Sequence, residues 1–348
     1  MPDRAAARRG AGARLDGRRV LLVVATSTGG VGRHVRSLVD GLTERGAVVQ
    51  VAGPQSTQDV FGFPSYAVVE IGQAPHPIRD AAALTVLRRL AGRVDVVHAH
   101  GLRAGAMAPA SRPLVVTWHN AQLDGGRLGR LLERHVARRA DVTLAASDDL
   151  ARHALACGAL DVRLAPVSAP ALRASGRDPG LGHPLVLAVG RLHAQKGYEV
   201  LLDALPLIGD AVVAVAGDGP LRADLAARAP QVRWLGHRDD VADLYAAADV
   251  VVLPSVWEAR SLTAQEAMRA GRPLVAADVG AIAGLVGDGA VLVPPGDPEA
   301  LGLAVRRLLD DPAEAAALAA RGRAVAAGWP DERDTVAQVA AVYTELLG

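Results

Sequence analysis

The chain alternates short apolar runs with longer segments in which apolar residues recur at helical spacing. The runs of the first half are RRVLLVVAT (18–26), AVVQVAG (47–53), VDVVHAHG (94–101), PLVVTWHN (113–120) and ADVTLAAS (140–147). Continuous apolar runs of this length are typical of strands that are buried on both faces of a parallel sheet. Parallel strands need helical crossovers, so the alternation predicts a doubly wound α/β domain.

The same alternation starts again after a segment rich in Pro, Gly and Ser, residues 168–184, which we interpret as a linker. The strands predicted beyond it are LVLAVG (185–190), DAVVAVAG (210–217), QVRWLG (231–236), ADVVVLPS (248–255) and RPLVAADV (272–279). Residues from Pro298 onward show only helical patterns, and the last helix starts after Trp329-Pro330. We therefore expect two Rossmann-like domains, 18–175 and 185–327, that face each other across a cleft, followed by a C-terminal helix at 328–348.

Composition narrows the function. With 50% hydrophobic but only 3% aromatic residues, the cores must be built from Ala, Val and Leu. The 38 basic and 37 acidic residues nearly cancel, so no global field indicates a nucleic-acid partner. The single cysteine, Cys157, has no disulfide partner and no metal-type spacing, which favours a reducing compartment.

No apolar run reaches the roughly 18 residues of a membrane span, and no signal-peptide stretch is found, so the sequence predicts a cytoplasmic protein. Residues 1–17 contain mainly Arg, Ala and Gly and are expected to form a flexible basic tail. The arginines of this tail could make weak peripheral contact with anionic lipid, although a solvated leader is the preferred interpretation.

The first specialised strand end is ATSTGGVGRHV, where Gly30-x-Gly32 follows a strand. A dinucleotide fingerprint is excluded because Val35 stands where its third glycine belongs, and because no acidic residue closes the second strand. What remains is a glycine-rich turn that lets backbone approach a ligand closely, or a plain tight turn.

The second strand end is AVGRLHAQKGYEV, which delivers Arg191 and, five residues later, Lys196 into a loop before a helix. A planar bidentate donor and a flexible point charge together can hold a diphosphate and neutralise charge on a departing phosphate. The alternative is a pair of solvated basic side chains.

A third strand end carries Glu258 and Glu266, which are separated by seven residues. The strand pattern stops at Pro254, and a helix is predicted over 261–270. The first N–H groups of that helix, at Ser261–Thr263, lack intrahelical partners and favour a phosphate. Carboxylates on both sides of an anion site indicate a ligand with hydroxyls as well as phosphate, such as a nucleotide sugar, whereas the alternative is a solvated helix face.

Histidines mark two first-domain strand ends. His119 ends the predicted strand 113–120, and His98 and His100 alternate along the strand before it. No carboxylate or thiol accompanies them at the strand end to complete a site, so we predict no metal site there. The pair Asp239-Asp240 opens a predicted helix, where acids cap free N–H groups without a metal.

Taken in order, these motifs resemble the family 4 glycosyltransferases, which are retaining enzymes of the GT-B fold. The resemblance covers residues 18 to 348 and rests on GGVGRHV, HAHG, TWHN, VGRLHAQKGYEVLLDAL, VAGDGPLRADL, WLGHRDDVADLYAAADVVVLPS, the glutamate pair and LVPPGDPEAL. It implies transfer of a sugar from a nucleotide-diphosphate donor to an acceptor hydroxyl, with no cofactor and no catalytic metal. The family's last helix often crosses back onto the first domain.

The resemblance also implies roles for single residues. The backbone at Gly30 approaches the donor diphosphate, and Arg191 and Lys196 clamp it. Glu258 contacts the donor sugar near its reacting carbon, and Glu266 binds the ribose of the nucleotide.

In the same family, the position of His119 lies near the sugar and the acceptor. The loop Gly236–His237–Arg238 holds the base through its backbone. The helix start at Ser261, Leu262 and Thr263 adds to the phosphate site.

Two departures from the family pattern keep alternatives open. Glu258 is followed by Ala259-Arg260-Ser261 where the family commonly has a glycine, so that Arg260 could add a donor-binding charge. Residues 165–170, APVSAP, replace the usual Asn-Gly turn. The alternatives are another GT-B enzyme, namely a nucleotide-sugar epimerase or a sugar phosphorylase, and a non-catalytic nucleotide-sugar-binding subunit. The acceptor class is open among small molecules, glycans and lipid-linked acceptors.

Overall fold

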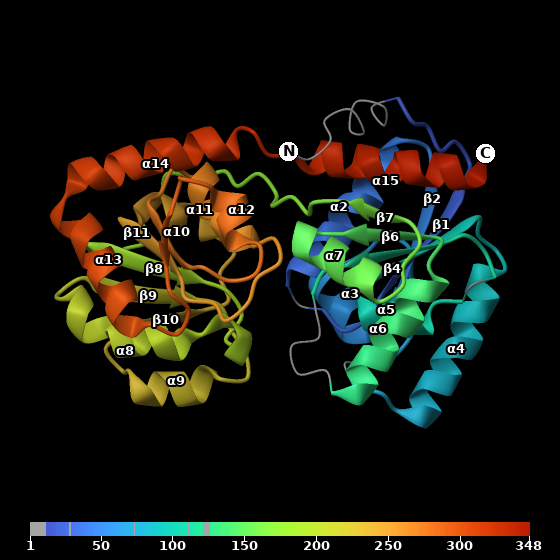
Figure 1. Ribbon diagram of the computed structural model, residues 1–348, viewed down its shortest axis with the longest axis horizontal. Coiled ribbons are helices and arrows are strands. Elements are labelled where there is room, and N and C mark those ends of the chain that lie inside the picture. Colours follow the sequence, from blue (N-terminus) through green and yellow to red (C-terminus); the bar gives the residue numbers. More distant parts are fainter. Residues whose placement is uncertain (1–11, 28, 73, 110, 121–125) are drawn as a thin grey trace. The chain divides into compact units, whose positions relative to one another are not determined.

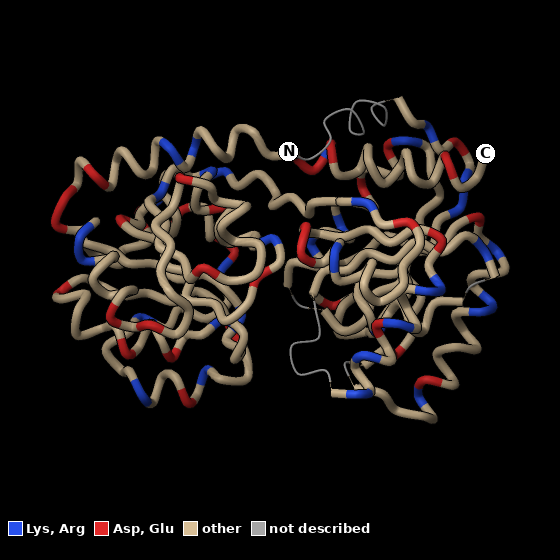
Figure 2. Tube along the Cα trace, viewed as in Figure 1, with Lys and Arg blue, Asp and Glu red and all other residues tan. Residues whose placement is uncertain are grey.

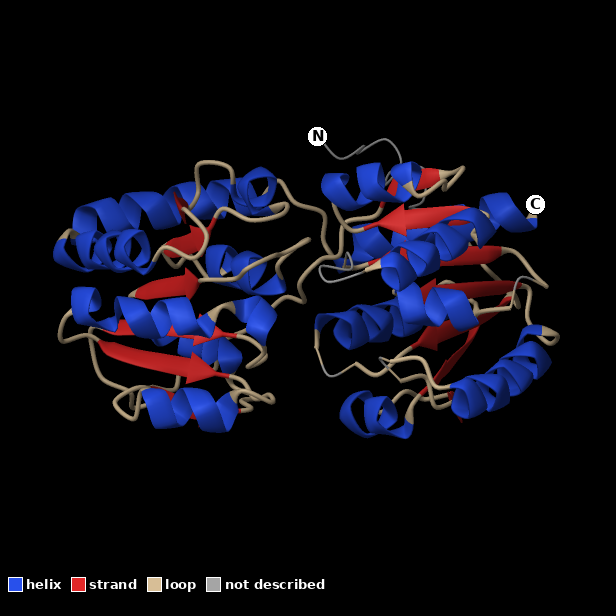
Figure 3. Ribbon diagram, turned by 60° about the horizontal axis from the view of Figure 1, so that its bottom comes forward, coloured by secondary structure: helices blue, strands red, loops and turns tan. Residues whose placement is uncertain are grey.

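A computed structural model describes residues 12–27, 29–72, 74–109, 111–120 and 126–348 of the chain (Figure 1). The chain forms two compact units. Unit 1 comprises Met1–Ser168 and Pro330–Gly348, and unit 2 comprises Ala169–Trp329. The chain therefore passes between the units twice. In each unit, helices cover both faces of one sheet (Figure 3), so the predicted doubly wound architecture is confirmed for both.

The sheet of unit 1 has seven parallel strands in the order β3-β2-β1-β4-β5-β6-β7. Their bounds are β1 (Arg19–Val24), β2 (Val48–Gly53), β3 (Tyr66–Val68), β4 (Val96–His100), β5 (Leu114–Trp118), β6 (Val142–Ala145) and β7 (Val162–Leu164). From β1 the chain first builds the sheet outward through β2 and β3, and then returns to place β4 on the other side of β1. This reversal is the topological switch point, where doubly wound sheets bind ligands at the carboxyl ends of their strands.

Helices from both ends of the chain complete unit 1. They are α2 (Gly30–Glu44), α3 (Gln55–Phe61), α4 (Pro77–Ala91), α5 (Leu102–Met107), α6 (Arg127–Arg139), α7 (Asp148–Ala156) and α15 (Glu332–Leu347). Figure 1 shows α15 lying beside α2, where a Cβ added at Gly41 would come within 2.6 Å of Val336. Asp331 caps α15 by accepting a hydrogen bond from the Asp334 N–H at 2.9 Å. The C-terminal helix is thus an integral part of unit 1.

The sheet of unit 2 has six parallel strands in the order β10-β9-β8-β11-β12-β13. Their bounds are β8 (Leu185–Val189), β9 (Val212–Ala216), β10 (Arg233–Gly236), β11 (Val250–Leu253), β12 (Leu274–Ala277) and β13 (Val291–Val293). The helices are η1 (Ala194–Lys196), α8 (Tyr198–Ile208), α9 (Arg222–Arg228), α10 (Val241–Ala247), α11 (Leu262–Arg269), α12 (Ile282–Val286), α13 (Pro298–Asp310) and α14 (Pro312–Ala326). The switch point lies between the neighbouring strands β8 and β11.

Each sheet separates two aliphatic cores, because successive strand residues point to opposite faces. Along β1, Leu21 and Val23 enter one cluster, whereas Val20, Leu22 and Val24 enter the other. Along β8, Val186 and Leu187 divide in the same way. This arrangement accounts for the continuous apolar runs of the sequence. Acidic and basic residues are interspersed over both units (Figure 2), in line with the balanced charge.

One end of the chain differs from the sequence prediction. Leu15 belongs to the predicted flexible tail, but it is 2% exposed and its N–H donates to the Arg45 carbonyl at 2.8 Å. An apolar side chain next to β1 gains more from joining the core than from solvation. Residues 1–11 of that tail lie outside the described residues. Among the described helices, none is both long and apolar enough to cross a membrane.

Candidate functional site

The switch point of unit 2 brings a predicted basic residue and a predicted acidic residue into contact. Lys196 lies in the loop after β8, Glu258 lies in the loop after β11, and β8 and β11 are adjacent. The Lys196 Nζ and Glu258 Oε1 atoms are 2.5 Å apart, and the Ser255 hydroxyl donates to the same oxygen at 2.7 Å. The Lys196 side chain is 22% exposed and that of Glu258 8%. Because the Lys196 ammonium is partly accessible to solvent, it can move from the Glu258 carboxylate to an anionic ligand.

The backbone around this pair is closely packed. The Val256 N–H donates to the Gln195 carbonyl at 2.8 Å, and Gln195 Nε2 donates to the Trp257 carbonyl at 3.0 Å. Gly280 has a φ of +55°, and a Cβ there would overlap the Glu258 carbonyl oxygen. That carbonyl also accepts from the Ala281 N–H at 3.0 Å. The carboxylate of Glu258 is therefore carried by a rigid loop, as a functional side chain requires.

Arg191 and Lys196 differ in their surroundings, although the sequence suggested a matched pair. Arg191 is exposed, and its side chain forms no hydrogen bond or ion pair within the part of the chain that the structure describes. Only Lys196 of the two is already engaged with a carboxylate. The structure thus leaves the Arg191 guanidinium available to an anionic ligand.

The amino-acid composition also singles out Lys196, independently of the motif in which it lies. Lys196 is the only lysine in the sequence, so the other 37 of the 38 basic residues are arginines. An ammonium is a compact, flexible point charge, whereas a guanidinium is a planar fork. A chain that otherwise uses arginine throughout places its one ammonium against Glu258, which indicates a task specific to lysine.

The start of α11 is attached to the end of β8. Ser261 caps the helix by accepting from the Ala264 N–H at 3.4 Å, and the Thr263 hydroxyl donates to the Val189 carbonyl at 3.0 Å. The first intrahelical bond runs from Gln265 N–H to the Ser261 carbonyl. The N–H groups of Leu262 and Thr263 precede it and have no carbonyl one turn back. A phosphate site at this helix start stays a prediction.

Glu266 and the β10 loop lie on either side of this helix start in the sequence. The Glu266 side chain is buried, and the Tyr245 hydroxyl donates to its Oε2 at 3.0 Å. In the β10 loop, Gly236 has a φ of +68° and accepts a hydrogen bond from the Gly217 N–H at 2.8 Å. The exposed His237 lies 3.4 Å from Asp239.

Two charged residues near the site are engaged differently from expectation. Asp240 stands at the N-cap of α10 but makes no side-chain cap, because it accepts from Arg238 Nε at 2.6 Å instead. The guanidinium of Arg260 lies 6.0 Å from the Trp329 ring centroid, and burial beside Arg269 lowers the pKa of Arg260 to about 10. Arg260 therefore packs on an aromatic ring, and the structure gives no direct support to its predicted role as a donor-binding charge.

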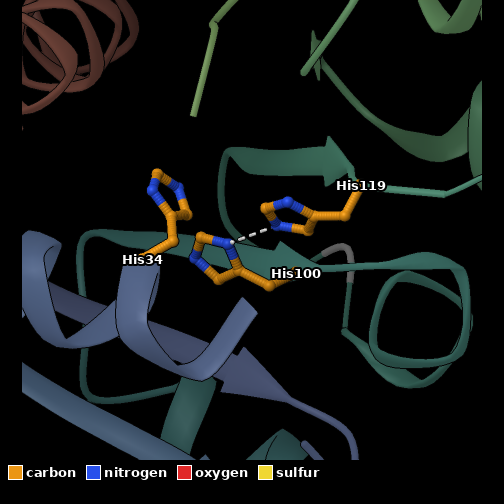
Figure 4. Close-up of side chains that lie close together, drawn as sticks. All are labelled: His34, His100 and His119. Atoms are coloured by element: carbon orange, nitrogen blue, oxygen red, sulfur yellow. Dashed lines mark hydrogen bonds between the residues drawn. The ribbon is translucent and has the colours of Figure 1, made fainter. Parts of the chain in front are cut away.

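The switch point of unit 1 gathers histidines. His100 ends β4, His119 follows β5, and His34 projects from α2, which follows β1. His100 Nδ1 and His119 Nε2 are 3.2 Å apart, and the His34 ring centroid lies 5.4 Å from both other rings (Figure 4). No role is assigned to His34 from the sequence, although the motif GGVGRHV contains it, because a histidine inside a helical pattern carries no signal of its own.

His98 has a different role from its neighbour His100. Its two ring nitrogens bond to the Tyr343 hydroxyl and the Thr117 hydroxyl, both at 2.6 Å. Tyr343 belongs to α15, so this buried network ties the C-terminal helix to the centre of the sheet. His98 is accordingly a structural residue.

Burial controls the protonation of these histidines. It lowers the pKa of His34 to about 4 and that of His98 to about 3, and it holds the pKa values of His100 and His119 well below their usual range. The physical cause is the loss of hydration of the charged form, reinforced for His100 and His119 by neighbouring imidazoles. All four rings are therefore neutral near pH 7, and each can donate or accept hydrogen bonds but not supply charge.

The glycine-rich turn before α2 has a packing role as well. The Gly32 N–H donates to the Ser27 hydroxyl at 3.1 Å, and a Cβ at Gly32 would overlap the Phe61 ring. Gly30 is the first residue of α2. Close packing explains Gly32, whereas Gly30 stays the position predicted to approach a ligand.

Comparison with known proteins agrees with this arrangement. Residues 29–170 match the family described as "Glycosyl transferase 4-like domain", and residues 183–311 match "Glycosyl transferases group 1". A phosphatidyl-myo-inositol mannosyltransferase of Mycobacterium leprae is 33% identical over 325 residues, which cover 81% of this chain and 84% of the relative. A D-inositol 3-phosphate glycosyltransferase of Xylanimonas cellulosilytica is 32% identical, over 91% of this chain and 92% of the relative.

A solved structure shares the fold. The crystal structure of Anabaena HepE in complex with UDP and glucose superposes with a TM-score of 0.81 at 20% sequence identity, over 94% of this chain and 100% of that one. The family follows from two matching domain models, from relatives that align over most of the chain, and from the two doubly wound units. The protein belongs to the family 4 glycosyltransferases of the GT-B fold and is a glycosyltransferase.

Proposed function

We propose that the protein is a retaining glycosyltransferase that moves a sugar from a nucleotide-diphosphate donor to an acceptor hydroxyl. The observation that carries the proposal is the contact of Lys196 with Glu258 and Ser255 beside the start of α11. It unites a cation, a carboxylate and free helix N–H groups at one switch point. The structural neighbour with UDP and glucose supports a nucleotide sugar as donor.

The diphosphate is the part of the donor that the cationic groups suit. Arg191 offers a bidentate guanidinium, and Lys196 offers a point charge that can move from Glu258 to a phosphate oxygen. The N–H groups of Leu262 and Thr263 lie at the positive end of α11 and can donate hydrogen bonds to the same diphosphate. As the bond between the sugar carbon and the phosphate oxygen breaks, these fixed donors stabilise the growing phosphate charge.

The two glutamates bind different parts of the donor, namely its ribose and its sugar. Glu266, oriented by Tyr245, accepts hydrogen bonds from the ribose hydroxyls. Glu258 faces the sugar near its reacting carbon once Lys196 has turned to the phosphate. The acceptor oxygen bonds to that carbon on the face that the phosphate leaves, and the phosphate oxygen takes the acceptor proton. The backbone of Gly236, His237 and Arg238 holds the base.

Unit 1 contributes groups of a different kind. The neutral imidazole of His119 hydrogen-bonds to sugar or acceptor hydroxyls, and the backbone at Gly30 contacts the diphosphate. We propose that transfer needs no metal ion, because the cations of unit 2 supply the charge that a divalent ion would otherwise bring.

Helix α6 of unit 1 has a surface that suits contact with an anionic membrane. Helix α6 exposes Leu128 and Leu131, whose exposed fractions are 83% and 60%. Its exposed basic residues are Arg127, Arg130, Arg134 and Arg138. Basic and apolar side chains on one helix suit peripheral contact with anionic lipid. We therefore propose a cytoplasmic enzyme that can work at a membrane surface on a lipid-linked acceptor.

The test begins with the nucleotide and ends with stereochemistry. Thermal unfolding with UDP, GDP and ADP identifies the base, because a bound ligand raises stability by mass action. The matching α-linked nucleotide sugar is then incubated with candidate acceptors, and proton NMR assigns the product anomer. An α-linked product supports the proposal. An inverted product, release of an epimerised donor, or tight nucleotide binding without turnover overturns it.

A further inference from the structure

We propose that His34, His100 and His119 form a binding site for one divalent transition-metal ion of the Zn²⁺ class. The three rings come from α2, from β4 and from the loop after β5, and they turn toward one another (Figure 4). Each offers a ring nitrogen, and these atoms all lie within 4.8 Å of one another. The inference goes beyond the proposed transfer reaction, which uses no metal, and the binding itself does not depend on that reaction.

The spacing of two of the ligands already fits a metal. His100 Nδ1 and His119 Nε2 are 3.2 Å apart. In a tetrahedral site with bonds of 2.0–2.1 Å, two ligand nitrogens stand about 3.3 Å apart. The same two atoms can therefore share a proton or an ion with little movement. The His34 ligand atom lies within 4.8 Å of the other two and supplies the third position.

The group is also incompletely satisfied as it stands. Within the part of the chain that the structure describes, the buried His100 Nε2 has no hydrogen-bond partner. Buried polar atoms without partners are uncommon and often mark the place of a water molecule, which here would accept the proton that Nε2 carries when Nδ1 binds the ion. His98 fixes the ring beside it, with its own nitrogens bonded to Tyr343 and Thr117 and its centroid 4.2 Å from that of His100. Such outer contacts hold metal ligands in place.

The chemistry of the ligand set selects the ion. Histidine binds metal through a nitrogen of the neutral imidazole. Three imidazoles suit Zn²⁺, Co²⁺, Ni²⁺ or Cu²⁺. Mg²⁺ and Ca²⁺ require oxygen ligands and are not expected to bind. A three-histidine site leaves a fourth position open to water.

A second group of possible ligands in unit 1 provides the control. Glu133 and His153 already form an ion pair at 3.1 Å, and Cys157 Sγ lies 3.9 Å from His153 Nε2. Burial and the charge of Glu133 raise the pKa of Cys157, which opposes the thiolate that a metal needs. This group is therefore the weaker candidate.

Occupation of the histidine site has a functional consequence. The ion takes one ring nitrogen of His119, the imidazole to which the proposed function assigns hydroxyl recognition. Zn²⁺ at the site is then a reversible inhibitor of transfer, relieved by a chelator. Only this consequence rests on the proposed function.

The binding is tested without any donor or acceptor. Chelator-treated full-length protein is titrated with CoCl₂ while the visible ligand-field absorption of tetrahedral Co²⁺ is recorded. We expect saturation at one ion per chain, reversal by ZnCl₂ and no effect of MgCl₂. His34→Ala should weaken Co²⁺ binding by more than the roughly 10- to 100-fold that loss of an outer contact costs.

His153→Ala is the matched control and should leave the titration unchanged. Circular dichroism verifies that each variant folds, and His34→Gln replaces His34→Ala if the smaller side chain does not fold. The proposal is overturned if the wild-type protein gives no ligand-field absorption. Unchanged Co²⁺ affinity in the folded His34 variant, or loss of the absorption in His153→Ala, overturns it equally. None of these readings depends on whether the protein transfers a sugar.

Discussion

Lys196 forms an ion pair with Glu258, and we propose that it moves from this carboxylate to the diphosphate when the donor binds. We predict that Lys196→Ala lowers kcat/KM by an amount equal to about 2–4 kcal/mol of transition-state stabilisation, as expected when a donor to a developing oxyanion is lost. Lys196→Arg should recover only part of it, because a planar fork cannot follow the same path. Steady-state kinetics on folded variants provides the measurement.

The same residue offers a labelling test. Since Lys196 is the only lysine, acetylation of side-chain amines reports on a single site, which mass spectrometry quantifies apart from the chain's α-amine. The matching nucleoside diphosphate should protect Lys196. Full turnover in Lys196→Ala, or labelling that ignores the nucleotide, would remove this residue from the diphosphate site.

The two glutamates should give different phenotypes. Glu266→Ala should weaken nucleoside diphosphate binding about 10- to 150-fold through the loss of ribose hydrogen bonds, since hydrogen bonds to a charged group contribute about 1.5–3 kcal/mol. Glu258→Ala should abolish most transfer but leave that affinity equal or higher, because it frees Lys196 from its carboxylate. Calorimetric titration beside turnover separates the two. Equal loss of nucleotide affinity in both variants would show that the roles are wrongly assigned.

His34 makes the stability of unit 1 sensitive to acid. Its pKa is about 4 in the folded chain and about 6.5 when unfolded. Between these values the unfolded chain binds a proton that the folded chain does not, so the free energy of unfolding falls as pH decreases from about 6.5 to 4. From pH 7 to 5 the loss is about 2 kcal/mol for this histidine alone.

Urea unfolding followed by tryptophan fluorescence measures this loss. The variant His34→Leu should show a shallower pH dependence by about one proton, whereas His237→Leu, which removes an exposed ring, should not. If His34→Leu keeps the full acid sensitivity, the pKa of His34 is not lowered by folding.

At the scale of elements, apolar runs predicted the strands that are buried on both faces. The strands that escaped prediction, β3, β7 and β13, are each three residues long. Such short strands obtain their hydrogen bonds from one neighbouring strand and carry almost no periodic signal. The Lys196–Glu258 contact follows from strand order, because β8 and β11 become neighbours only after the sheet reverses. The meeting of His34 with His100 required the same knowledge, which no spacing within the sequence contains.

Helix α6 is the element whose surface predicts a partner. We expect the protein to bind vesicles that contain phosphatidylserine, with an electrostatic contribution of roughly 1 kcal/mol per arginine that reaches the surface. The double variant Leu128→Asp, Leu131→Asp should lose most of the binding in a vesicle sedimentation assay, and added salt should weaken it in the wild type. Ile78→Asp on α4 is the matched control, since Ile78 is 79% exposed. Equal losses in both variants would contradict a role for α6.

At the scale of the whole molecule, both units place their candidate functional groups at the switch point of the sheet. The kind of group differs between them. Unit 2 presents charged side chains and helix N–H groups, whereas unit 1 presents neutral imidazoles. A charged diphosphate suits the groups of unit 2, and an uncharged hydroxyl suits those of unit 1, so the two units differ in the ligand chemistry that each can serve.

This division predicts how the whole enzyme responds to metal ions. In the proposed function, Arg191, Lys196 and the start of α11 meet the charge on the leaving diphosphate, so we expect that a divalent ion is not required. The acidic pair Asp239-Asp240 is already engaged with His237 and Arg238. We expect turnover to survive exhaustive treatment with EDTA and to change less than about twofold on addition of MgCl₂, since a lost catalytic metal would cost several kcal/mol.

The measurement is initial rate against chelator and metal concentration, with protein passed through a desalting column so that no ion is carried over. ZnCl₂ should lower the rate of the wild type, and a higher ZnCl₂ concentration should be needed to inhibit His34→Ala, because this variant lacks one ligand of the histidine site. Loss of activity with EDTA and its return with Mg²⁺ or Mn²⁺ would mean that an ion shares the diphosphate with Lys196. In that case the acidic pair at the start of α10 becomes the first place to search, because carboxylate oxygens are the ligands that those ions prefer.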